Sequence, residues 1–436
     1  MPTHPASSPP PLHVLIVGAG LGGTACAIAC RAQGFRVTLL DQVTRFAPLG
    51  DSIGLGPNVS RLLGRWDGGF ADKLAAISST SESIVVHDYR DGRVLGVDAT
   101  PGTAEATFGH RSLIGHRGHY HMLFLEQCEA MGVEVRSGAR VVGYDVEKPS
   151  VTLEGGEEVV GDVVVAADGV KSLGRKEVLG YLDEPVHSGY AVYRAFMEGE
   201  TFRDDPLTAP FVENGDSIHL YLGPDLHGFV TCLRDGKWIN AVLTHKDDAD
   251  IDEGWSFPGK KSDILPLIKD WDPGFRRIWE KMEEKNILDW KLVYRPCLKK
   301  WVTDSGKVAI MGDAAHPFVP TSVQGASQAM EDGATIAKCL AKANGDVPLA
   351  LHTFFELRYE HVAKAQGMGL SQREKWHNLH DKETGEMKQE FDMSNGLLES
   401  YVLFSHDCEK VVDEKWDSVS AEVKAKMERG EKLSRE

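Results

Sequence analysis

A chain of 436 residues is too long for a single ordinary core, so its length predicts two or three domains. A net charge of −17 argues against binding to nucleic acid or to an anionic membrane, because both need a basic surface. The composition is globular, and no segment approaches the ~18 uninterrupted apolar residues of a membrane-spanning helix.

The N-terminal residues and the cysteines bear on location. Residues 1–11 are rich in Pro and Ser and lack the basic and apolar regions of a signal peptide, so they are predicted to form a disordered leader. The seven cysteines are scattered and odd in number, which favours buried free thiols in a reducing compartment. The sequence therefore predicts a cytoplasmic protein without a membrane span.

The first elements form a βαβ unit. Residues 12–17 are a short apolar run rich in β-branched side chains, which predicts a buried strand. An Ala-rich helix is predicted over 21–33, with Gly34 as its stop, and a second strand is predicted over 35–40. Two strands joined by a helix require a parallel sheet at the N-terminus.

The pattern of apolar and polar residues changes between residues 188 and 247. Aromatic and polar residues alternate there, as at Tyr190, Tyr193 and Phe196, which favours an antiparallel sheet with one exposed face. Outside this segment the parallel-sheet pattern recurs. Further helices are predicted from 58–64 and over 119–131, 263–284 and 322–343, and further strands over 133–136, 140–153, 158–166 and 308–311.

These patterns predict a discontinuous organisation. We expect a parallel-sheet domain made of residues 12–180 and 291–371, with an antiparallel-sheet domain of residues 181–290 inserted between them. The charged segment 372–436 is predicted to be a helical tail, either a peripheral helix pair or a dimer contact. The protein is expected to be a monomer or a homodimer.

A glycine-rich turn, Gly18-Ala-Gly20-Leu-Gly-Gly23, follows the first strand. Gly18 permits the tight turn, Gly20 lets the backbone approach a pyrophosphate, and Gly23 lets helix and strand pack closely. Asp41 comes about twenty residues later, at the end of the next strand, where a carboxylate can accept from ribose hydroxyls. The turn predicts dinucleotide binding without separating FAD from NAD; a glycine turn used only for packing is the alternative.

Two further motifs follow buried strands. Asp168-Gly169 comes after the strand over 158–166, at the sheet edge where ligands bind, although Asp-Gly also serves ordinary strand-to-turn junctions. Gly312-Asp313 comes after the strand over 308–311. A loop stiffened by prolines then leads to a helix N-terminus near Gly325, where free amides can stabilise the charge of a reduced cofactor.

Together the three motifs resemble those of the flavoprotein monooxygenases, a family typified by aromatic-ring hydroxylases such as salicylate hydroxylase. The resemblance runs from Val14 to about Gln372. It implies an α/β fold with a Rossmann-type FAD-binding domain, an antiparallel-sheet substrate domain and a C-terminal helical segment.

The resemblance also implies which residues bind FAD. The glycine turn would hold the pyrophosphate and Asp41 the adenosine ribose, although most relatives carry Glu there. Gly54 would lie in the loop over the flavin, Arg117 would reach the phosphates or the ring, and Asp313 the ribityl or pyrophosphate part. The predicted cofactor-binding residues are Gly18, Gly20, Gly23, Asp41, Gly54, Arg117, Asp168, Asp313, Gly325 and Ala326.

Two residues of the middle domain are predicted to be catalytic. Arg194 matches the arginine of the family's aromatic-Arg pair, and His227 closes a segment, Gly223-Pro-Asp-Leu-His227, whose histidine contacts the phenol oxygen in related hydroxylases. His227 could accept the phenol proton near neutral pH, and Arg194 could hold a phenolate or a carboxylate. A surface-loop histidine and a structural salt bridge are the alternatives. Relatives usually continue with Tyr-Pro where this chain has Cys232-Leu233, so substrate identity does not carry over.

The activity implied is that of an FAD-dependent monooxygenase. NADH or NADPH would reduce FAD, dioxygen would be trapped as a flavin hydroperoxide, and one oxygen atom would pass to a phenolic or aromatic-acid substrate. No second glycine turn is visible, so the coenzyme is expected to bind transiently, and no metal is predicted. Two alternatives stay open: a same-fold FAD-dependent epoxidase or oxidase of a non-aromatic secondary metabolite and, more remotely, a non-enzymatic binding protein.

Overall fold

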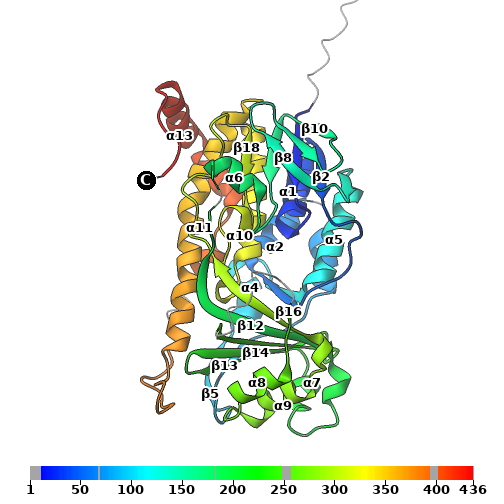
Figure 1. Cartoon of the computed structure of the whole chain (residues 1–436), viewed down its shortest axis with the longest axis vertical. Coiled ribbons are helices and arrows are strands. Elements are labelled where there is room, and N and C mark those ends of the chain that lie inside the picture. The colour runs from blue at the N-terminus through cyan, green and yellow to red at the C-terminus, as the bar shows by residue number, and fades with distance from the viewer. Residues whose placement is uncertain (1–10, 67–68, 182, 248–256, 393–400, 436) are drawn as a thin grey trace, which may run out of the picture.

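The computed structural model describes residues 11–66, 69–181, 183–247, 257–392 and 401–435. It contains a parallel sheet, a larger mainly antiparallel sheet and a set of long helices that run along both (Figure 1). The predicted α/β fold class is thereby confirmed. Residues 1–10 of the predicted leader lie outside the described residues.

The parallel sheet has five strands in the order β18-β11-β1-β2-β7. Its strands are β1 (His13–Val17), β2 (Arg36–Asp41), β7 (Glu134–Ser137), β11 (Val163–Ala166) and β18 (Val308–Ile310). Alternate side chains of β1 enter two different cores. Val14 and Ile16 pack on the helical side, whereas Leu15 and Val17 pack against a small sheet on the other side. Because both faces are covered, the central strand β1 and its neighbour β11 are almost purely apolar, whereas the edge strand β7 is mainly polar.

The small covering sheet consists of β8 (Val141–Asp145), β9 (Ser150–Leu153) and β10 (Glu158–Val160). The sequence predicted one strand over 158–166, but the structure divides it at Gly161. A Cβ at Gly161 would lie 2.7 Å from Leu15 Cγ and 2.9 Å from the His13 carbonyl oxygen. The chain therefore passes from one sheet to the other at the residue that permits the closest approach.

The larger sheet has eight strands in the order β16-β17-β12-β15-β14-β13-β4-β5. Its strands are β4 (Ile84–Asp88), β5 (Val94–Asp98), β12 (Val186–Glu198), β13 (Ser217–Gly223), β14 (Leu226–Leu233), β15 (Trp238–Lys246), β16 (Phe257–Pro258) and β17 (Ile287–Tyr294). The domain predicted over 181–290 thus also recruits β4 and β5, since β4 pairs in parallel with β13.

One face of this sheet is covered by helices. The inward side chains include Tyr193, Leu243 and Val230, which share a core with Phe275 and Trp279 of α9 (Pro273–Lys281). α8 (Lys261–Leu267) completes the cover. The predicted helix over 263–284 is therefore two helices separated by a turn. The opposite face of the sheet is turned toward the parallel sheet and its surrounding elements (Figure 1).

Of the remaining elements, α7 packs on the large sheet, and the others surround the parallel sheet or link the two sheets. They are α1 (Leu21–Ala32), β3 (Ser52–Leu55), α2 (Pro57–Trp66), α3 (Phe70–Ala76), α4 (Thr100–Phe108), β6 (Leu113–His116), α5 (Arg117–Ala130), α6 (Leu173–Leu179), α7 (Pro210–Glu213), α10 (Gly325–Lys342), α11 (Val347–His377) and α13 (Cys408–Glu428).

The longest helix connects the two domains. α11 spans 31 residues and runs from its packing on α10 and α13 down to β13 and β14 of the large sheet (Figure 1). The domain boundary predicted at residue 372 falls inside this helix. In the part of the chain that the structure describes, no helix has both the length and the apolar content needed to cross a membrane.

Close packing of α1 on α10 generates the first prediction. A Cβ at Gly333 would lie 2.7 Å from the Cys26 Cα, a backbone atom that cannot rotate away. We therefore expect Gly333→Ala to lower the free energy of unfolding by about 1–3 kcal/mol. Gly367→Ala is the matched control, since Gly367 is an exposed glycine within α11 with nothing described within 4 Å of an added Cβ. That change should raise the free energy of unfolding by about 0.5–1 kcal/mol. Chemical denaturation measures both, and a change of the same sign in the two variants would contradict the packing account.

Candidate functional site

Four predicted cofactor residues lie at one edge of the parallel sheet. Gly18 follows β1, Asp41 ends β2, Asp168 comes two residues after β11, and Asp313 comes three residues after β18. All of these strands run in the same direction, so their carboxyl ends meet at a single edge. This is the edge at which α/β sheets bind ligands.

The three glycines of the first turn have different physical roles. Gly18 has φ +102°, which favours glycine, and a Cβ at Gly23 would lie 1.9 Å from the Gly18 carbonyl oxygen. Gly20, in contrast, has an ordinary extended backbone, and an added Cβ there meets nothing described within 4 Å. Neither backbone conformation nor packing requires glycine at position 20. The open space in front of it fits a pyrophosphate on the uncapped N-terminus of α1.

The carboxylate of Asp41 stabilises this turn through hydrogen bonds. One carboxylate oxygen accepts the Ala19 N–H at 2.7 Å and the other accepts the Val43 N–H at 2.8 Å. Each oxygen retains a second acceptor site, so the group fits the ribose hydroxyls predicted for it.

Asp168 is used differently. Its carboxylate accepts the hydroxyls of Tyr144 and Ser172 and the backbone N–H groups of Leu173 and Gly174, at 2.5–3.1 Å. It therefore caps α6. Four protein donors leave little capacity for a cofactor group, so the geometry gives the cofactor contact predicted for Asp168 no support.

Asp313 has the opposite character. It is half-buried, and no described residue donates a hydrogen bond to its carboxylate. Burial raises its pKa, against the opposing effect of the positive charges of His316 and Arg117. Arg117 begins α5, is exposed, and has its stem 3.4–3.7 Å from a Cβ built at Gly50. A carboxylate and a guanidinium that no side chain among the described residues pairs with fit the hydroxyls and phosphates of FAD.

A buried ion cluster positions the Gly312-Asp313 turn. Asp332 of α10 accepts the Gly312 N–H at 3.0 Å and the Arg358 Nε–H at 2.9 Å, and lies 2.6 Å from His316 Nε2. Its neighbour Glu331 pairs with another Arg358 nitrogen at 2.5 Å and accepts the side-chain amide of Asn58 at 2.6 Å. One guanidinium therefore connects α10, α11, α2 and the turn that carries Asp313.

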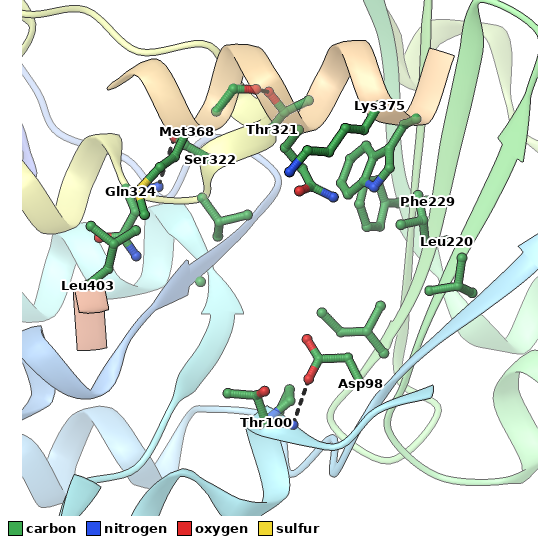
Figure 2. Close-up of a pocket in the computed structure, with 18 of the residues that line it drawn as sticks. Asp98, Thr100, Leu220, Phe229, Thr321, Ser322, Gln324, Met368, Lys375 and Leu403 are labelled. Atoms are coloured by element: carbon green, nitrogen blue, oxygen red, sulfur yellow. Dashed lines mark hydrogen bonds between the residues drawn. The ribbon is translucent and has the colours of Figure 1, made fainter. Parts of the chain in front are cut away.

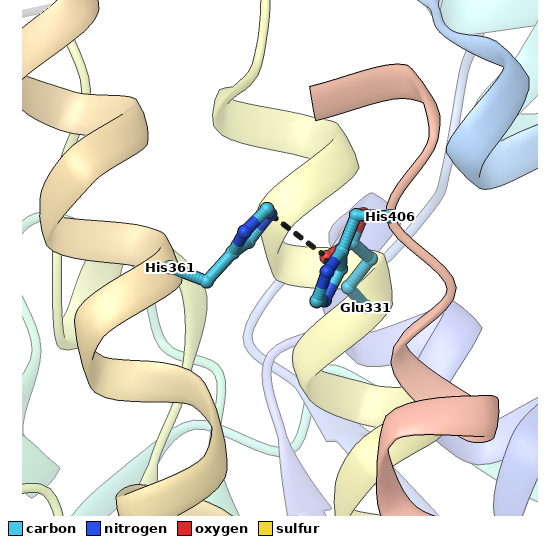
Figure 3. Close-up of side chains that lie close together, drawn as sticks. All are labelled: Glu331, His361 and His406. Atoms are coloured by element: carbon cyan, nitrogen blue, oxygen red, sulfur yellow. Dashed lines mark ion pairs between the residues drawn. The ribbon is translucent and has the colours of Figure 1, made fainter. Parts of the chain in front are cut away.

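Two histidines complete the cluster (Figure 3). His361 of α11 and His406 stack with ring centroids 3.6 Å apart, and each Nε2 lies 3.6–3.7 Å from Glu331 Oε2. Three such ligand atoms could hold a metal ion. An Arg358 nitrogen, however, lies 2.5 Å from Glu331 Oε2 and 3.3 Å from His406 Nε2. Because this guanidinium already neutralises the carboxylate, the three side chains fit the arginine that they contact and not a metal ion.

The residues predicted to meet the flavin ring lie close together. A Cβ at Gly54 of β3 would lie 3.1 Å from Val323 Cγ1, and Val323 directly precedes Gln324, the uncapped N-cap of α10. Gly325 and Ala326 are the first residues of that helix. Val323 itself has φ +51° and is 58% exposed, an unfavourable conformation and environment for a β-branched side chain. A flat apolar group lying against this site would cover it.

A cavity of about 580 Å³ opens beside these residues. Leu220 and Phe229 line it on the side of the large sheet, and Met368 and Gln324 lie across the opening (Figure 2). Its walls are mainly apolar. The other lining residues are Gly54, Leu55, Gly56, Ile84, Val86, Asp98, Thr100, Pro101, Ser112, Ile114, Thr321, Ser322, Val323, Gly369, Gln372, Lys375, Trp376, Leu379, Gln389, Glu390, Phe391, Asp392, Leu403 and Phe404. The cavity therefore joins the predicted flavin contacts to the large sheet.

Arg194 lies on the cavity side of the sheet but does not line the cavity. It shares one cross-strand row with Val242, Phe229 and Leu220, so all four side chains project from the same face. It is buried, its Nη1 lies 3.2 Å from Asp51, and its guanidinium packs over the Trp290 ring at 5.3 Å.

His227 projects from the same face, one row further along, and is enclosed by protein. Its Nδ1 lies 2.8 Å from His377 Nε2, and its Nε2 lies 3.1 Å from the Thr244 hydroxyl. Burial lowers its pKa well below the usual value, and His377 and Arg373 lower it further. The sequence predicted that His227 and Arg194 share one pocket; the structure gives them one face of the sheet, but neither lines the cavity.

The sequence interpretation missed the contribution of α11. Met368, Gln372, Lys375 and Trp376 of α11 line the cavity and follow the spacing of one helix face, and Leu379 lines it just beyond the helix. That periodicity was present in the sequence. The segment from residue 372 onward was instead interpreted as a charged tail.

Comparisons with known proteins agree with this geometry. A family model described as "FAD binding domain" matches residues 11–365. The chain is 32% identical to the asperlicin C monooxygenase of Petromyces alliaceus, covering 86% of this chain and 83% of that protein. It is also 32% identical to the FAD-dependent monooxygenase OpS4 of Beauveria bassiana, covering 84% and 86% of the two chains.

Solved structures show the same fold. CtdE in complex with FAD and its substrate 4 superposes with a TM-score of 0.85 at 26% identity, over 95% of this chain and all of that one. A salicylate hydroxylase substrate complex superposes with a TM-score of 0.76 at 22% identity, over 92% of this chain and 97% of that one.

The glycine turn generates a prediction about cofactor content. Gly20→Val should leave the fold intact, because the backbone is extended and nothing described surrounds the added side chain, yet it should block approach of the pyrophosphate. We expect this variant, and Asp313→Ala, to lose most of their FAD. Flavin absorbance after gel filtration measures the content, and the melting temperature of the apoprotein serves as the folding control. Wild-type flavin content in both variants would contradict the assignment.

The stacked histidines generate a prediction about pH. Burial beside Arg358 lowers the pKa of His361 to about 2 and that of His406 to about 3. The unfolded chain takes up these protons near pH 6.5, so the folded state holds fewer protons below that pH and stability falls as the pH falls. Each such histidine adds about 1.4 kcal/mol per pH unit to the slope below about pH 6.

The test is the free energy of unfolding measured between pH 7 and pH 5. His361→Phe retains a ring to stack on His406 and should flatten the slope. His187→Gln, at an exposed position, is the control and should leave the slope unchanged. An identical slope in wild type and in His361→Phe would show that His361 takes up its proton in the folded protein.

Proposed function

The chain belongs to the family defined by this FAD-binding domain and is an FAD-dependent monooxygenase, and from this premise we propose that it uses NADH or NADPH and dioxygen to oxygenate a large, mainly apolar aromatic metabolite. The observation that carries the proposal is the cavity of about 580 Å³ between the predicted flavin contacts and the large sheet.

The residues proposed to hold FAD follow the sheet edge and then the start of α10. The glycine turn and Arg117 would bind phosphates, Asp41 and Asp313 would accept from hydroxyls, and the first amides of α10 would face the ring beside Gly54. When bound, FAD supplies the reduction of dioxygen and the transfer of one oxygen atom. The chain itself contributes binding, orientation and the exclusion of water.

The cavity walls indicate the substrate class. A cavity of about 580 Å³ lies within the range of roughly 300–1,000 Å³ that is typical of ligand pockets, and its walls are mainly apolar. Phe229 and Trp376 offer aromatic surfaces on which a multi-ring substrate could pack.

We propose that Arg194 supports the cavity wall and does not bind the substrate itself, because it does not line the cavity. Its guanidinium is fixed by Asp51, which lies just before β3, and it shares a sheet row with the cavity residue Phe229. His227 is not suited to act as a base near neutral pH, because burial lowers its pKa and both its ring nitrogens contact protein groups. We assign it a positioning role, since its ring packs edge-on against Trp376 on the cavity wall.

A second candidate is epoxidation of an electron-rich double bond. The described residues that line the cavity include no arginine and no histidine. Phenol hydroxylation gains from a base that forms the phenolate, whereas epoxidation needs no deprotonation. A non-enzymatic binding role does not fit a chain whose relatives are named monooxygenases.

The experiment is an oxygen-transfer screen. The purified holoenzyme is given NADH or NADPH, ¹⁸O₂ and a panel that pairs single-ring phenols with multi-ring aromatic compounds. The proposal expects coenzyme consumption coupled to a product that carries one ¹⁸O, with multi-ring compounds preferred. The position of the label separates hydroxylation from epoxidation. Consumption that yields only hydrogen peroxide across the panel, or a preference for single-ring phenols, would contradict it.

Removing one aromatic wall of the cavity should weaken catalysis selectively. Phe229→Ala is expected to lower kcat/KM for a multi-ring substrate roughly 30-fold, the effect of losing an anchor worth about 2 kcal/mol. Flavin content should be unchanged. Tyr221→Phe is the control, because Tyr221 projects from the opposite face of the sheet into the α9 core. Steady-state kinetics measures both, and equal losses in the two variants would indicate a general disturbance of the sheet.

A further inference from the structure

Three cationic side chains near the start of α5 have no carboxylate partner among the described residues. They are Arg117, Arg234 and Lys237, and all three are exposed. Many other exposed cations of this acidic chain form ion pairs, as Arg65 does with Asp407 and Lys148 does with Glu158. Exposed cations without a carboxylate partner in a protein of net charge −17 are candidates for binding an anion.

Two of these cations, Arg234 and Lys237, lie near His119. Arg117 and His119 belong to the first turn of α5, and the positive charges of Arg234 and Lys237 reach His119 strongly enough to lower its pKa, in addition to the effect of burial. Arg234 and Lys237 come from the turn between β14 and β15, where Arg234 has φ +56°. We call Arg234 and Lys237 the cationic patch.

An aromatic surface lies beside the patch. The Lys237 ammonium lies 5.8 Å from the centroid of the Trp238 ring, and Trp238 stacks on Phe196 at 5.3 Å. Phe196 in turn contacts His116, the N-cap of α5, at 4.8 Å. Cations next to half-buried rings provide contacts for phosphates and for a flat heterocycle.

Two acids of the adjoining turns do not neutralise the patch. Asp216 is occupied by two backbone N–H groups, those of Thr80 and Asp235, and Asp235 lies next to Arg234 in the turn. Neither carboxylate pairs with Arg234 or Lys237 in the described part of the chain.

The patch also adjoins the proposed FAD site. Arg117, assigned above to FAD, is two residues from His119. The Ser52 hydroxyl of β3 accepts the side-chain amide of Asn240, two residues beyond Trp238 in the chain. A reductant bound at the patch would therefore lie beside the β3 loop, which leads to the proposed flavin contact at Gly54.

We propose that the cationic patch and the Trp238 ring bind the nicotinamide coenzyme, the patch holding its phosphates and Trp238 one of its rings. The inference rests on the proposed function, because it assumes that NADH or NADPH is the reductant. The inference explains how the coenzyme could bind without a second glycine turn. An exposed patch of positive charges suits a coenzyme that binds transiently and dissociates after it has reduced FAD.

The test is a titration of the FAD-loaded protein with NADP⁺ and with NAD⁺, which bind without turnover, followed by isothermal calorimetry. Arg234→Glu/Lys237→Glu reverses two charges of the patch and should raise the Kd of the preferred coenzyme on the order of 10-fold or more. The matched control is Lys415→Glu/Lys424→Glu, which makes the same charge change on exposed positions of α13, away from α5 (Figure 1). Bound FAD should be equal in all three proteins.

The outcomes separate this inference from the proposed function. A Kd that is unchanged in the patch variant, or raised equally in patch and control variants, would overturn the patch while leaving the monooxygenase proposal standing. Wild-type protein that binds neither coenzyme, and whose FAD neither NADH nor NADPH reduces, would overturn the proposed reductant and the patch together. A stronger effect for NADP⁺ than for NAD⁺ would assign the patch to the additional phosphate.

Discussion

The buried guanidinium of Arg358 is the interaction on which the geometry of the site depends. It compensates two adjacent carboxylates, Glu331 and Asp332, that would otherwise lie unpaired in the core. Through Asp332 it orients the Gly312-Asp313 turn. Through Glu331 it contacts Asn58 in the first turn of α2, the helix that follows strand β3 and its Gly54. Removing one partner of a buried ion pair typically costs about 3–5 kcal/mol. The cluster therefore holds the separated cofactor motifs in one arrangement.

From this arrangement the placement of the cavity follows. α10 starts at the proposed flavin ring, whereas α11, fixed to α10 by the same guanidinium, continues along the large sheet. The cavity lies where the C-terminal half of α11, the sheet and the β3 loop meet, and its volume is set by side chains such as Phe229 and Trp376. Substrate selection thus depends on residues outside the cofactor motifs, which is consistent with a common fold serving different substrates.

The parts of this account that could be predicted from sequence are those fixed by local chemistry. Buried strands, the positive φ of Gly18 and the tight packing at Gly23 each follow from a few neighbouring residues, and the structure places them as expected. The contacts of the Asp168 carboxylate could not be predicted, because the N–H groups of α6 that reach it are positioned only by the folded turn. The contact of His227 with His377, 150 residues later, could not be predicted either. Contacts of that kind, like the pairing of β4 with β13, are set by tertiary packing.

The most direct test of the central claim is a crystal structure of the holoenzyme with FAD bound. The account predicts that the pyrophosphate lies at Gly20 on the N-terminus of α1, and that the flavin ring lies between Gly54 and the start of α10 with one face toward the cavity lined by Phe229 and Trp376. A flavin ring bound elsewhere, with this cavity separated from it by protein, would contradict the claim that the cavity is where oxygen is transferred.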